Sequence, residues 1–299
     1  MSGELELARI AVAVVGTAIA TYYDLTHNRN VPDWLSFGML GLGVVAAIAG
    51  LWGASIAAVT TVALPAAVVL AAGYLFYKAG QIGGADVVIF AAIALLMPTA
   101  PAVIFENGIV SLPALQLPFV LSLFLISGIL FGIVTFARFF LPCICAAMKG
   151  EVRLGLEQKI YLVLLAVTGL VFLWFAGSNA LPVQFAIIFL AALLFSAFFY
   201  VFKSFIAQKF LIRIVGVKEI DEEDVLAVEE MDLAIVKKYG LKKLLTAAEI
   251  KRLAKVPIKK FPVYKNMPAF LPYVLAALLL SLLYGDIVTR VLSGAVAVH

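Results

Sequence analysis

The sequence predicts an all-α polytopic membrane protein of about eight transmembrane helices, with a small α+β cytoplasmic subdomain before the last helix. Of its 299 residues, 64% are hydrophobic and only 13% are charged, which is too apolar for a water-soluble domain. The charges are also concentrated, because residues 209–265 hold 13 of the 22 basic and 9 of the 18 acidic side chains. The chain therefore combines membrane-spanning segments with one water-exposed segment.

Eight apolar segments are each long enough to form one transmembrane helix of about 20 residues. They are residues 7–23, 35–52, 55–76, 86–104, 119–141, 160–176, 183–202 and 268–284. We accordingly divide the chain into a transmembrane core (1–208), a cytoplasmic subdomain (209–265) and a C-terminal transmembrane helix (266–299).

The charged segment has the patterns of a small folded unit. Residues 211–220 are rich in Ile and Val, which predicts a short strand. Thr246 and Glu249 have the spacing of a capping box, which predicts a helix that continues to about Lys255.

The distribution of basic residues predicts the orientation in the membrane. With these spans, 20 of the 22 Lys and Arg residues fall on one side, and the exceptions are Arg9 and Arg290. Cytoplasmic loops carry the excess of Lys and Arg, so this side is predicted to be cytoplasmic and both termini to lie outside. The net charge of +4 has the same explanation and does not indicate a nucleic-acid partner. The lipid bilayer is the expected environment, and the sequence leaves the oligomeric state open.

Small residues in the spans predict close helix contacts. Gly128 and Gly132 form a G-x-x-x-G pair, and Gly16 is spaced in the same way from Ala20. We expect these contacts within the chain. Cys143 and Cys145 have the wrong spacing for a zinc site and are interpreted as packing residues.

Two aspartates stand out because ionisable groups at membrane depth are costly and often mark a functional site. Asp24 ends the first span and Asp86 begins the fourth. Two spans lie between them, so the chain returns to the same side and both carboxylates are expected at cytoplasmic helix ends. They are thus able to meet in space.

The residues before Asp86 add to this prediction. Gly83 and Gly84 have no side chains, so another backbone can approach closely, and Ala85 is also small. An N-cap role for Asp86 explains the helix start, but it does not explain the matching Asp24.

Two carboxyl groups in one pocket of low dielectric constant do not both ionise easily, so one keeps its proton. This is the arrangement of an aspartic protease, in which one group activates water and the other polarises the peptide carbonyl. The chemistry needs neither a metal nor a cofactor. The only histidines are His27 and His299, and the sequence offers no Ser-His-Asp set or metal cluster.

These motifs resemble the type IV prepilin peptidases, and especially the archaeal preflagellin (prearchaellin) peptidases. The resemblance rests on Asp24, on Val31-Pro32-Asp33, and on Gly83-Gly84-Ala85-Asp86 as a G-x-hydrophobic-D motif. The late charged segment and a last helix entered through residues 266–272 also fit the archaeal group.

The resemblance implies an aspartic endopeptidase that cuts the short basic leader from type IV pilin-like or archaellin precursors at the cytoplasmic face of the plasma membrane. Asp24 and Asp86 would be the catalytic pair, in a peptidase core formed by residues 1–208. Methyltransferase activity is not expected, because the chain lacks the paired C-x-x-C motifs of bacterial relatives that methylate. Eight spans exceed the six expected for the core of the family.

Presenilin-type intramembrane proteases are an alternative, since Tyr23-Asp24 and Pro113-Ala-Leu115 resemble their signatures. The predicted topology puts residues 113–115 on the outer side, which favours a chance match. The stretch 267–270 lies on the correct side, and we interpret Pro268 and Ala269 as candidate substrate-binding residues.

A proton- or ion-coupled transporter is the competing function, because buried carboxylates also serve as ion sites. Asp286 is a further acid near a span, and we interpret it as a partner of Arg290 one turn later. A third possibility is a membrane platform for pilus assembly, in which the aspartates have no chemical role.

An acidic run in the subdomain is explained most simply as a solvated helix face. A sharper hypothesis is that it attracts the basic leader, with Glu222, Glu223 and Asp224 as candidate substrate-binding residues. The full set is Glu219, Asp221, Glu222, Glu223, Asp224, Glu229, Glu230 and Asp232. His27 and Arg29 flank Asp24 and are interpreted as interfacial polar residues.

Overall fold

The computed structural model describes residues 3–27, 30–53, 55–99, 118–152, 154–178 and 183–288. These residues are mostly helical, and they include one two-stranded sheet. The helices are α1 (Gly3–Thr26), α2 (Asp33–Leu51), α3 (Ile56–Lys78), α4 (Gly84–Leu96), α5 (Phe119–Met148), α6 (Leu156–Gly177), α7 (Val183–Ile206), α8 (Leu233–Tyr239), α9 (Ala247–Leu253) and α10 (Leu271–Tyr284). The strands are β1 (Ile212–Gly216) and β2 (Lys260–Tyr264).

Six of the described helices, α1, α2, α3, α5, α6 and α7, are long and apolar enough to cross a membrane. They make the chain a multi-pass membrane protein. The apolar helices α4 and α10 have only 13 and 14 residues. At a rise of 1.5 Å per residue such a helix is about 20 Å long, shorter than a hydrocarbon core of about 30 Å. The count of eight spans therefore stays a prediction, and residues 100–104 of the predicted fourth span lie outside the described residues.

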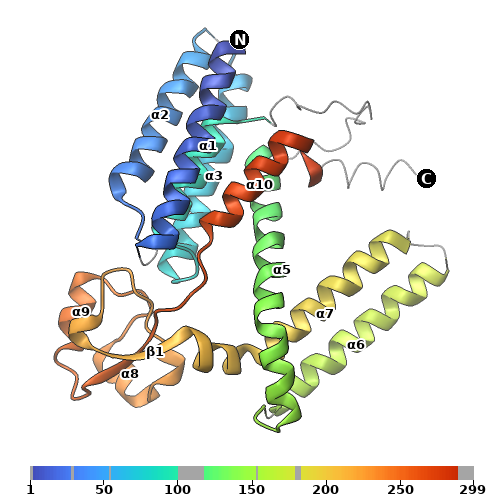
Figure 1. The fold of residues 1–299 in the computed structure, drawn as a ribbon, viewed down its shortest axis with the longest axis vertical. Helices are drawn as coiled ribbons and strands as arrows, with labels where there is room; N and C mark the ends of the chain where they lie inside the picture. Colours follow the sequence, from blue (N-terminus) through green and yellow to red (C-terminus); the bar gives the residue numbers. More distant parts are fainter. Residues whose placement is uncertain are drawn as a thin grey trace.

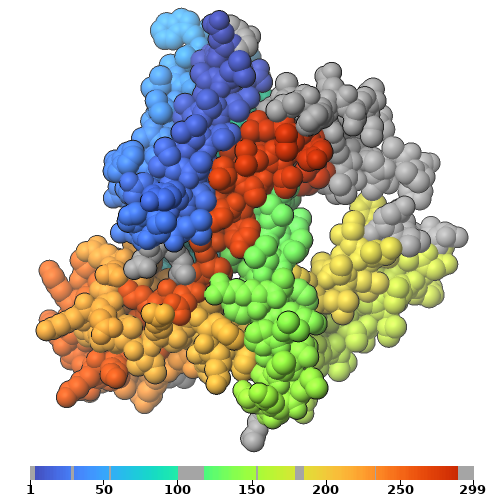
Figure 2. All heavy atoms as spheres, viewed as in Figure 1, coloured from blue at the N-terminus to red at the C-terminus, as the bar shows by residue number. Residues whose placement is uncertain are grey.

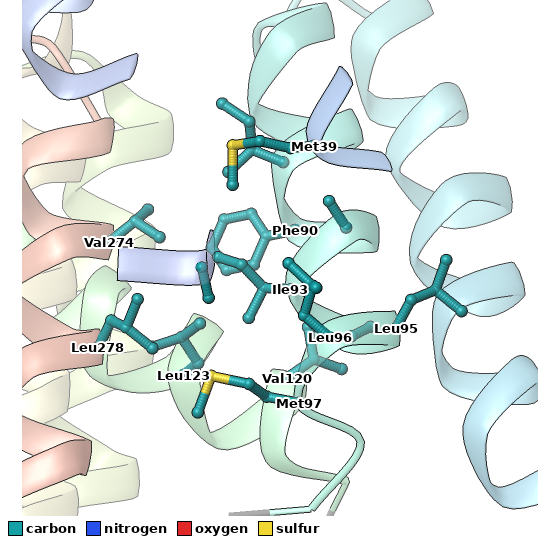
Figure 3. Close-up of a cluster of buried hydrophobic side chains, with 14 of the residues drawn as sticks. Met39, Phe90, Ile93, Leu95, Leu96, Met97, Val120, Leu123, Val274 and Leu278 are labelled. Carbon is teal, nitrogen blue, oxygen red and sulfur yellow. The ribbon is translucent and has the colours of Figure 1, made fainter. Parts of the chain in front are cut away.

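Helix α4 is the centre of the main apolar core. Every residue from Ile89 to Leu96 is buried, so the helix is apolar on all sides and has no polar face. Figure 3 shows its side chains among those of the surrounding helices. The labelled residues are Met39 of α2, Phe90, Ile93, Leu95 and Leu96 of α4, Met97, Val120 and Leu123 of α5, and Val274 and Leu278 of α10.

Glycines allow the helices of this core to approach closely. A Cβ atom at Gly43 of α2 would lie 3.1 Å from the Ala92 carbonyl oxygen of α4. A Cβ atom at Gly73 of α3 would lie 2.9 Å from Cγ2 of Val87 and still closer to Cγ1. The predicted contact at Gly16 is made with Met39, on the neighbouring helix α2.

Helices α5, α6 and α7 form a second part of the membrane region. Phe139 and Cys143 of α5 share a small core with Phe198 and Phe202 of α7. Gly132 faces the Phe195 ring of α7, at 2.7 Å from the Cβ position. A Cβ atom at Gly128 would meet no atom within 4 Å among the described residues, so only one glycine of the predicted pair makes a close contact. Cys145 is exposed.

The subdomain has its own apolar core under a short antiparallel sheet. Strand β1 confirms the strand predicted within residues 211–220, and it pairs with β2 so that Ile214 lies opposite Pro262. The Thr246 hydroxyl accepts a hydrogen bond from the Glu249 N–H at 3.4 Å, which confirms the predicted start of α9. The Glu249 carboxylate binds Arg252 at 3.1 Å, and the helix ends at Leu253, two residues earlier than expected.

The arrangement of the elements brings several helix ends to the subdomain. Figure 1 shows the subdomain at one end of the molecule, next to the end of α1 and the turn between α3 and α4, while the N-terminus lies at the opposite end. Helix α10 runs between α1 and α5 and contacts both, as the space-filling view also shows (Figure 2).

Candidate active site

Asp24 lies in the last helical turn of α1 and is only 7% exposed. Its Oδ2 atom accepts a hydrogen bond of 3.1 Å from the backbone N–H of Leu271. Leu271 is the first residue of α10, so the carboxylate of Asp24 faces a helix N-terminus. Unpaired N–H groups and the helix dipole favour a negative charge at this position.

Asp86 lies in the first turn of α4 and is half-buried. The backbone of Gly83 hydrogen-bonds to its carboxylate, which also faces the N-terminus of its own helix. The carboxylates of Asp86 and Asp24 interact electrostatically, so they belong to one region of the site. The parity of the spans in the sequence predicted this proximity.

The two glycines before Asp86 leave room for specific neighbours. A Cβ atom at Gly83 would lie 3.1 Å from Oδ2 of Asp86. A Cβ atom at Gly84 would lie 3.2 Å from the Tyr77 ring and 3.5 Å from Oε1 of Glu223. Neither glycine has a positive φ, so close approach is the reason for the missing side chains.

Tyr77 and Glu223 connect this loop to the subdomain. The Tyr77 hydroxyl, in the last turn of α3, donates a hydrogen bond of 2.9 Å to Oε1 of Glu223. Among the described residues, Glu223 is the only non-glycine residue with a positive φ, at 69°.

Residues 266–270 lead from β2 of the subdomain to the Leu271 amide that binds Asp24. The N–H of Asn266 donates to the Leu211 carbonyl at 3.1 Å. The Phe270 ring packs against the rings of Phe90 and Phe131, at centroid distances of 6.1 and 5.6 Å. Pro268 and Ala269, the candidate substrate-binding residues, are half-buried in this segment.

Most acids of the acidic run have partners within the chain. Asp221 and Asp224 bind Lys265, Glu223 binds Tyr77, Glu229 binds Tyr264 and Lys243, Glu230 binds Gln208, and Asp232 caps α8 at Ala234. Glu222 is exposed, and within the described residues it has no hydrogen bond or ion pair. The run is therefore largely a set of structural contacts, which the sequence pattern alone did not reveal.

The remaining candidates have other contacts or lie outside the described residues. The Nδ1 atom of His27 is 2.7 Å from the Thr26 hydroxyl, and the His27 side chain is exposed. Asp286 accepts a hydrogen bond of 2.9 Å from Ser122 of α5, whereas Arg290, its predicted partner, is outside the described residues. Arg29 and residues 113–115 are also outside them. The described residues contain no cluster of three or more potential metal ligands.

Sequence reasoning missed three groups at this site: the Leu271 amide, Tyr77 and Lys265. The pattern of residue types does not indicate which backbone amide will bind a distant side chain. Tyr77 and Lys265 do stand at informative places, one in the last turn of the helix before the glycines and the other directly before the segment that leads to α10.

The six long apolar helices and the interacting carboxylates at two helix ends define a multi-pass membrane protein with a two-aspartate site. The family model of the type IV leader peptidase family matches residues 11–137, a range that includes Asp24 and Asp86. For this part of the chain, the match confirms the family predicted from the motifs. A match to this family implies leader peptidase activity in a membrane protein. No curated protein and no solved structure gives a significant match.

Proposed function

We propose that this chain is an aspartic endopeptidase that removes the short basic leader from type IV pilin-like or archaellin precursors at the cytoplasmic face of the plasma membrane. The observation that carries the proposal is the site formed by Asp24 and Asp86. The two carboxylates interact, and each is bound by a backbone group at the N-terminus of a helix.

The proposed reaction uses the two carboxyl groups in complementary states of protonation. The ionised group takes a proton from water while the water oxygen attacks the scissile carbonyl carbon, and the protonated group donates its proton to the carbonyl oxygen. In the second half, the peptide C–N bond breaks. The newly protonated carboxyl group gives its proton to the leaving nitrogen, and the newly ionised one recovers a proton from the tetrahedral diol. The leader then leaves with a new carboxyl group, the mature protein has a new amino group, and both aspartates are restored.

The surroundings of the pair suit a precursor with a basic leader and an apolar helix. Residues 266–270 border Asp24, and we propose that Pro268 and Ala269 contact the extended segment around the cleavage site. Glu222, Glu223 and Asp224 lie in the subdomain on the side of Asp86, where negative charge attracts a basic leader at low salt. Glu222 is the one available to contact the leader, whereas Glu223 and Asp224 already bind Tyr77 and Lys265 and contribute only their charge.

Single Asp24→Asn and Asp86→Asn substitutions test the proposed pair. Each removes a group that has to change its protonation state, so we expect each variant to insert and fold but to lose precursor cleavage by at least about a thousandfold. Asp286→Asn is the matched control, because Asp286 is also a membrane-region acid but binds Ser122. Cleavage is measured with the full-length proteins and a purified precursor.

Two outcomes would contradict this assignment. One is a variant of Asp24 or Asp86 that keeps a tenth or more of the wild-type rate. The other is an Asp286→Asn variant as inactive as the first two, which would indicate that the loss of cleavage is not specific to the Asp24 and Asp86 pair.

A further inference from the structure

Residues 221–224, which we call the acidic loop, contact two segments that lead to the two aspartates. On one side, Glu223 accepts the hydrogen bond from Tyr77, at the end of the helix that precedes the Asp86 turn. On the other side, Asp221 and Asp224 bind Nζ of Lys265 at 2.8 and 2.5 Å. Lys265 directly precedes residues 266–270. The loop is thus joined both to the Asp86 side and to the Asp24 side of the site.

The backbone of the acidic loop is fixed within the subdomain. The N–H of Glu223 donates to the Leu245 carbonyl at 2.8 Å, and the N–H of Leu245 donates to the Asp224 carbonyl at 2.9 Å. These bonds hold Glu223 at its positive φ of 69°, a conformation that costs free energy unless the surrounding structure imposes it. Because the backbone is held in this way, the Glu223 carboxylate is presented to Tyr77 by a rigid support.

The turn before Asp86 packs directly on this support. Gly80 has a φ of +69°, and a Cβ atom there would lie 3.3 Å from Cγ1 of Val225, the residue after the acidic loop. A Cβ atom at Gly84 would lie 3.5 Å from Oε1 of Glu223. The glycines of residues 79–84 therefore let the turn approach both the acidic loop and Asp86.

We propose that the acidic loop is a positioning element, which holds the Asp86 turn and the segment before Leu271 in a fixed relation and so sets the geometry of the two aspartates. Tyr77, Glu223 and Lys265 are positioning residues that act through these segments and do not touch the substrate. The proposal rests on the proposed function of Asp24 and Asp86 as a catalytic pair. It gives the subdomain a role in catalysis beyond attraction of the leader.

Positioning and attraction of the leader predict different kinetics. Loss of a charge that attracts the basic leader slows the association of the precursor with the enzyme, so it raises KM in a salt-dependent way. Loss of a positioning contact leaves encounter intact and lowers kcat, since a small displacement of a catalytic group is enough to slow the reaction.

The test uses full-length variants with matched controls. Tyr77→Phe removes only the hydroxyl, and Tyr74→Phe makes the same change one turn earlier, where the structure gives the hydroxyl no hydrogen bond within the described residues. Glu223→Ala removes the acceptor, whereas Glu223→Gln retains a carbonyl oxygen that accepts from Tyr77. Lys265→Met is compared with Lys259→Met, an exposed lysine without an ion pair in the described part of the chain.

Two quantities are measured for each variant. One is backbone hydrogen exchange. The amides of Gly80 and Gln81 report on the Asp86 turn, and the amides of Asn266 and Leu271 report on the Asp24 side. Cleavage of a precursor gives kcat and KM.

At a salt concentration that screens attraction of the leader, we expect Tyr77→Phe and Glu223→Ala to speed exchange at Gly80 and Gln81. Both should lower kcat about tenfold with KM unchanged, because a hydrogen bond to a charged group is lost. The double variant should be no worse than either single one, Glu223→Gln should restore most of kcat, and Tyr74→Phe should equal wild type. Lys265→Met should speed exchange at Asn266 and Leu271 and lower kcat, unlike Lys259→Met.

Three results would overturn the proposal. The first is unchanged hydrogen exchange in both segments, and the second is faster exchange with an unchanged kcat. The third is a salt-dependent rise in KM as the sole effect of the substitutions. Cleavage that survives in Asp24→Asn would instead contradict the proposed function. The exchange measurement does not depend on cleavage and would still decide whether the loop holds the two segments.

Discussion

Asp24 and Asp86 are both bound by backbone groups at helix N-termini. A lysine or arginine side chain in that place would hold a carboxylate in its charged state. A backbone donor at a helix N-terminus stabilises the charge and still allows a proton to be gained or lost during the reaction. Backbone donors of this kind suit a pair of groups that exchange protons with a substrate.

Gly83→Ala tests how tightly Asp86 has to be held. The φ of Gly83 is −67°, which alanine adopts without strain, but the new Cβ would lie 3.1 Å from Oδ2 of Asp86. The carboxylate has to move by a few tenths of an ångström, so we expect kcat to fall by about tenfold with little change in thermal stability. Gly38→Ala, where no atom lies within 4 Å of the Cβ position, is the control. Wild-type kcat in Gly83→Ala would show that this contact is unimportant.

The sequence predicted that the two aspartates lie near each other, because the parity of membrane crossings places both at one face. It did not reveal their partners. The Leu271 amide is separated from Asp24 by 247 positions, and the Tyr77 hydroxyl is separated from Glu223 by 146. Such contacts depend on how α10 and the subdomain pack, which no local pattern records.

At the scale of elements, α4 is the helix on which the site depends. It is buried among α1, α2, α3, α5 and α10, so the position of Asp86 is set by packing along its whole length. Close approach at Gly43 and Gly73 fixes its distance from α2 and α3. A short, fully buried helix therefore gives Asp86 a rigid support.

Gly73→Ala tests this packing. Its Cβ would lie 2.9 Å from Cγ2 of Val87 and still closer to Cγ1, and overpacking of this kind costs about 1–3 kcal/mol. We expect a lower thermal unfolding midpoint in detergent. Adding Val87→Ala removes both Cγ atoms. The double variant should therefore lose less stability than the two single variants lose in sum. The control is Gly128→Ala, with no neighbour of the Cβ position within 4 Å. Additive effects at Gly73 and Val87 would contradict close packing here.

The sequence predicted the helices of the membrane region and β1 well, because hydrophobic length and β-branched residues are local signals. It did not predict β2, whose segment Lys260–Tyr264 contains Pro262 and has charged residues nearby. Strand β2 forms because Val215 and Phe261 pair across the sheet and share the subdomain core, a contact between distant segments. The lengths of α4 and α10 also could not be read from hydropathy alone.

At the scale of the whole molecule, the membrane region has two parts of different character. The part around α4 is well packed, whereas α6 and α7 expose many large apolar side chains, including Leu164, Trp174 and Leu194. Figure 1 shows these two helices as a hairpin set apart from α1 to α4. Such surfaces are stable only against lipid or another apolar surface.

The predicted orientation places the subdomain in the cytoplasm and the α6–α7 turn outside. Cysteine labelling tests this in a chain with both native cysteines replaced by alanine. A membrane-impermeant thiol reagent should label Ser178→Cys in intact cells, because Ser178 is exposed at the end of α6. It should label Lys259→Cys, in the subdomain, only after the cells are permeabilised. The opposite pattern would reverse the topology and move the site to the outer face.

The mass of a purified pilin-like or archaellin precursor, recorded before and after incubation with the full-length protein, tests the central claim most directly. We expect the wild-type chain to remove the leader in one cut just ahead of the apolar segment, leaving a new N-terminus. Chains with Asp24→Asn or Asp86→Asn should leave the precursor mass unchanged. A precursor that the wild-type chain leaves intact, or that both variants still cut, would contradict the assignment of this chain as an aspartic leader peptidase.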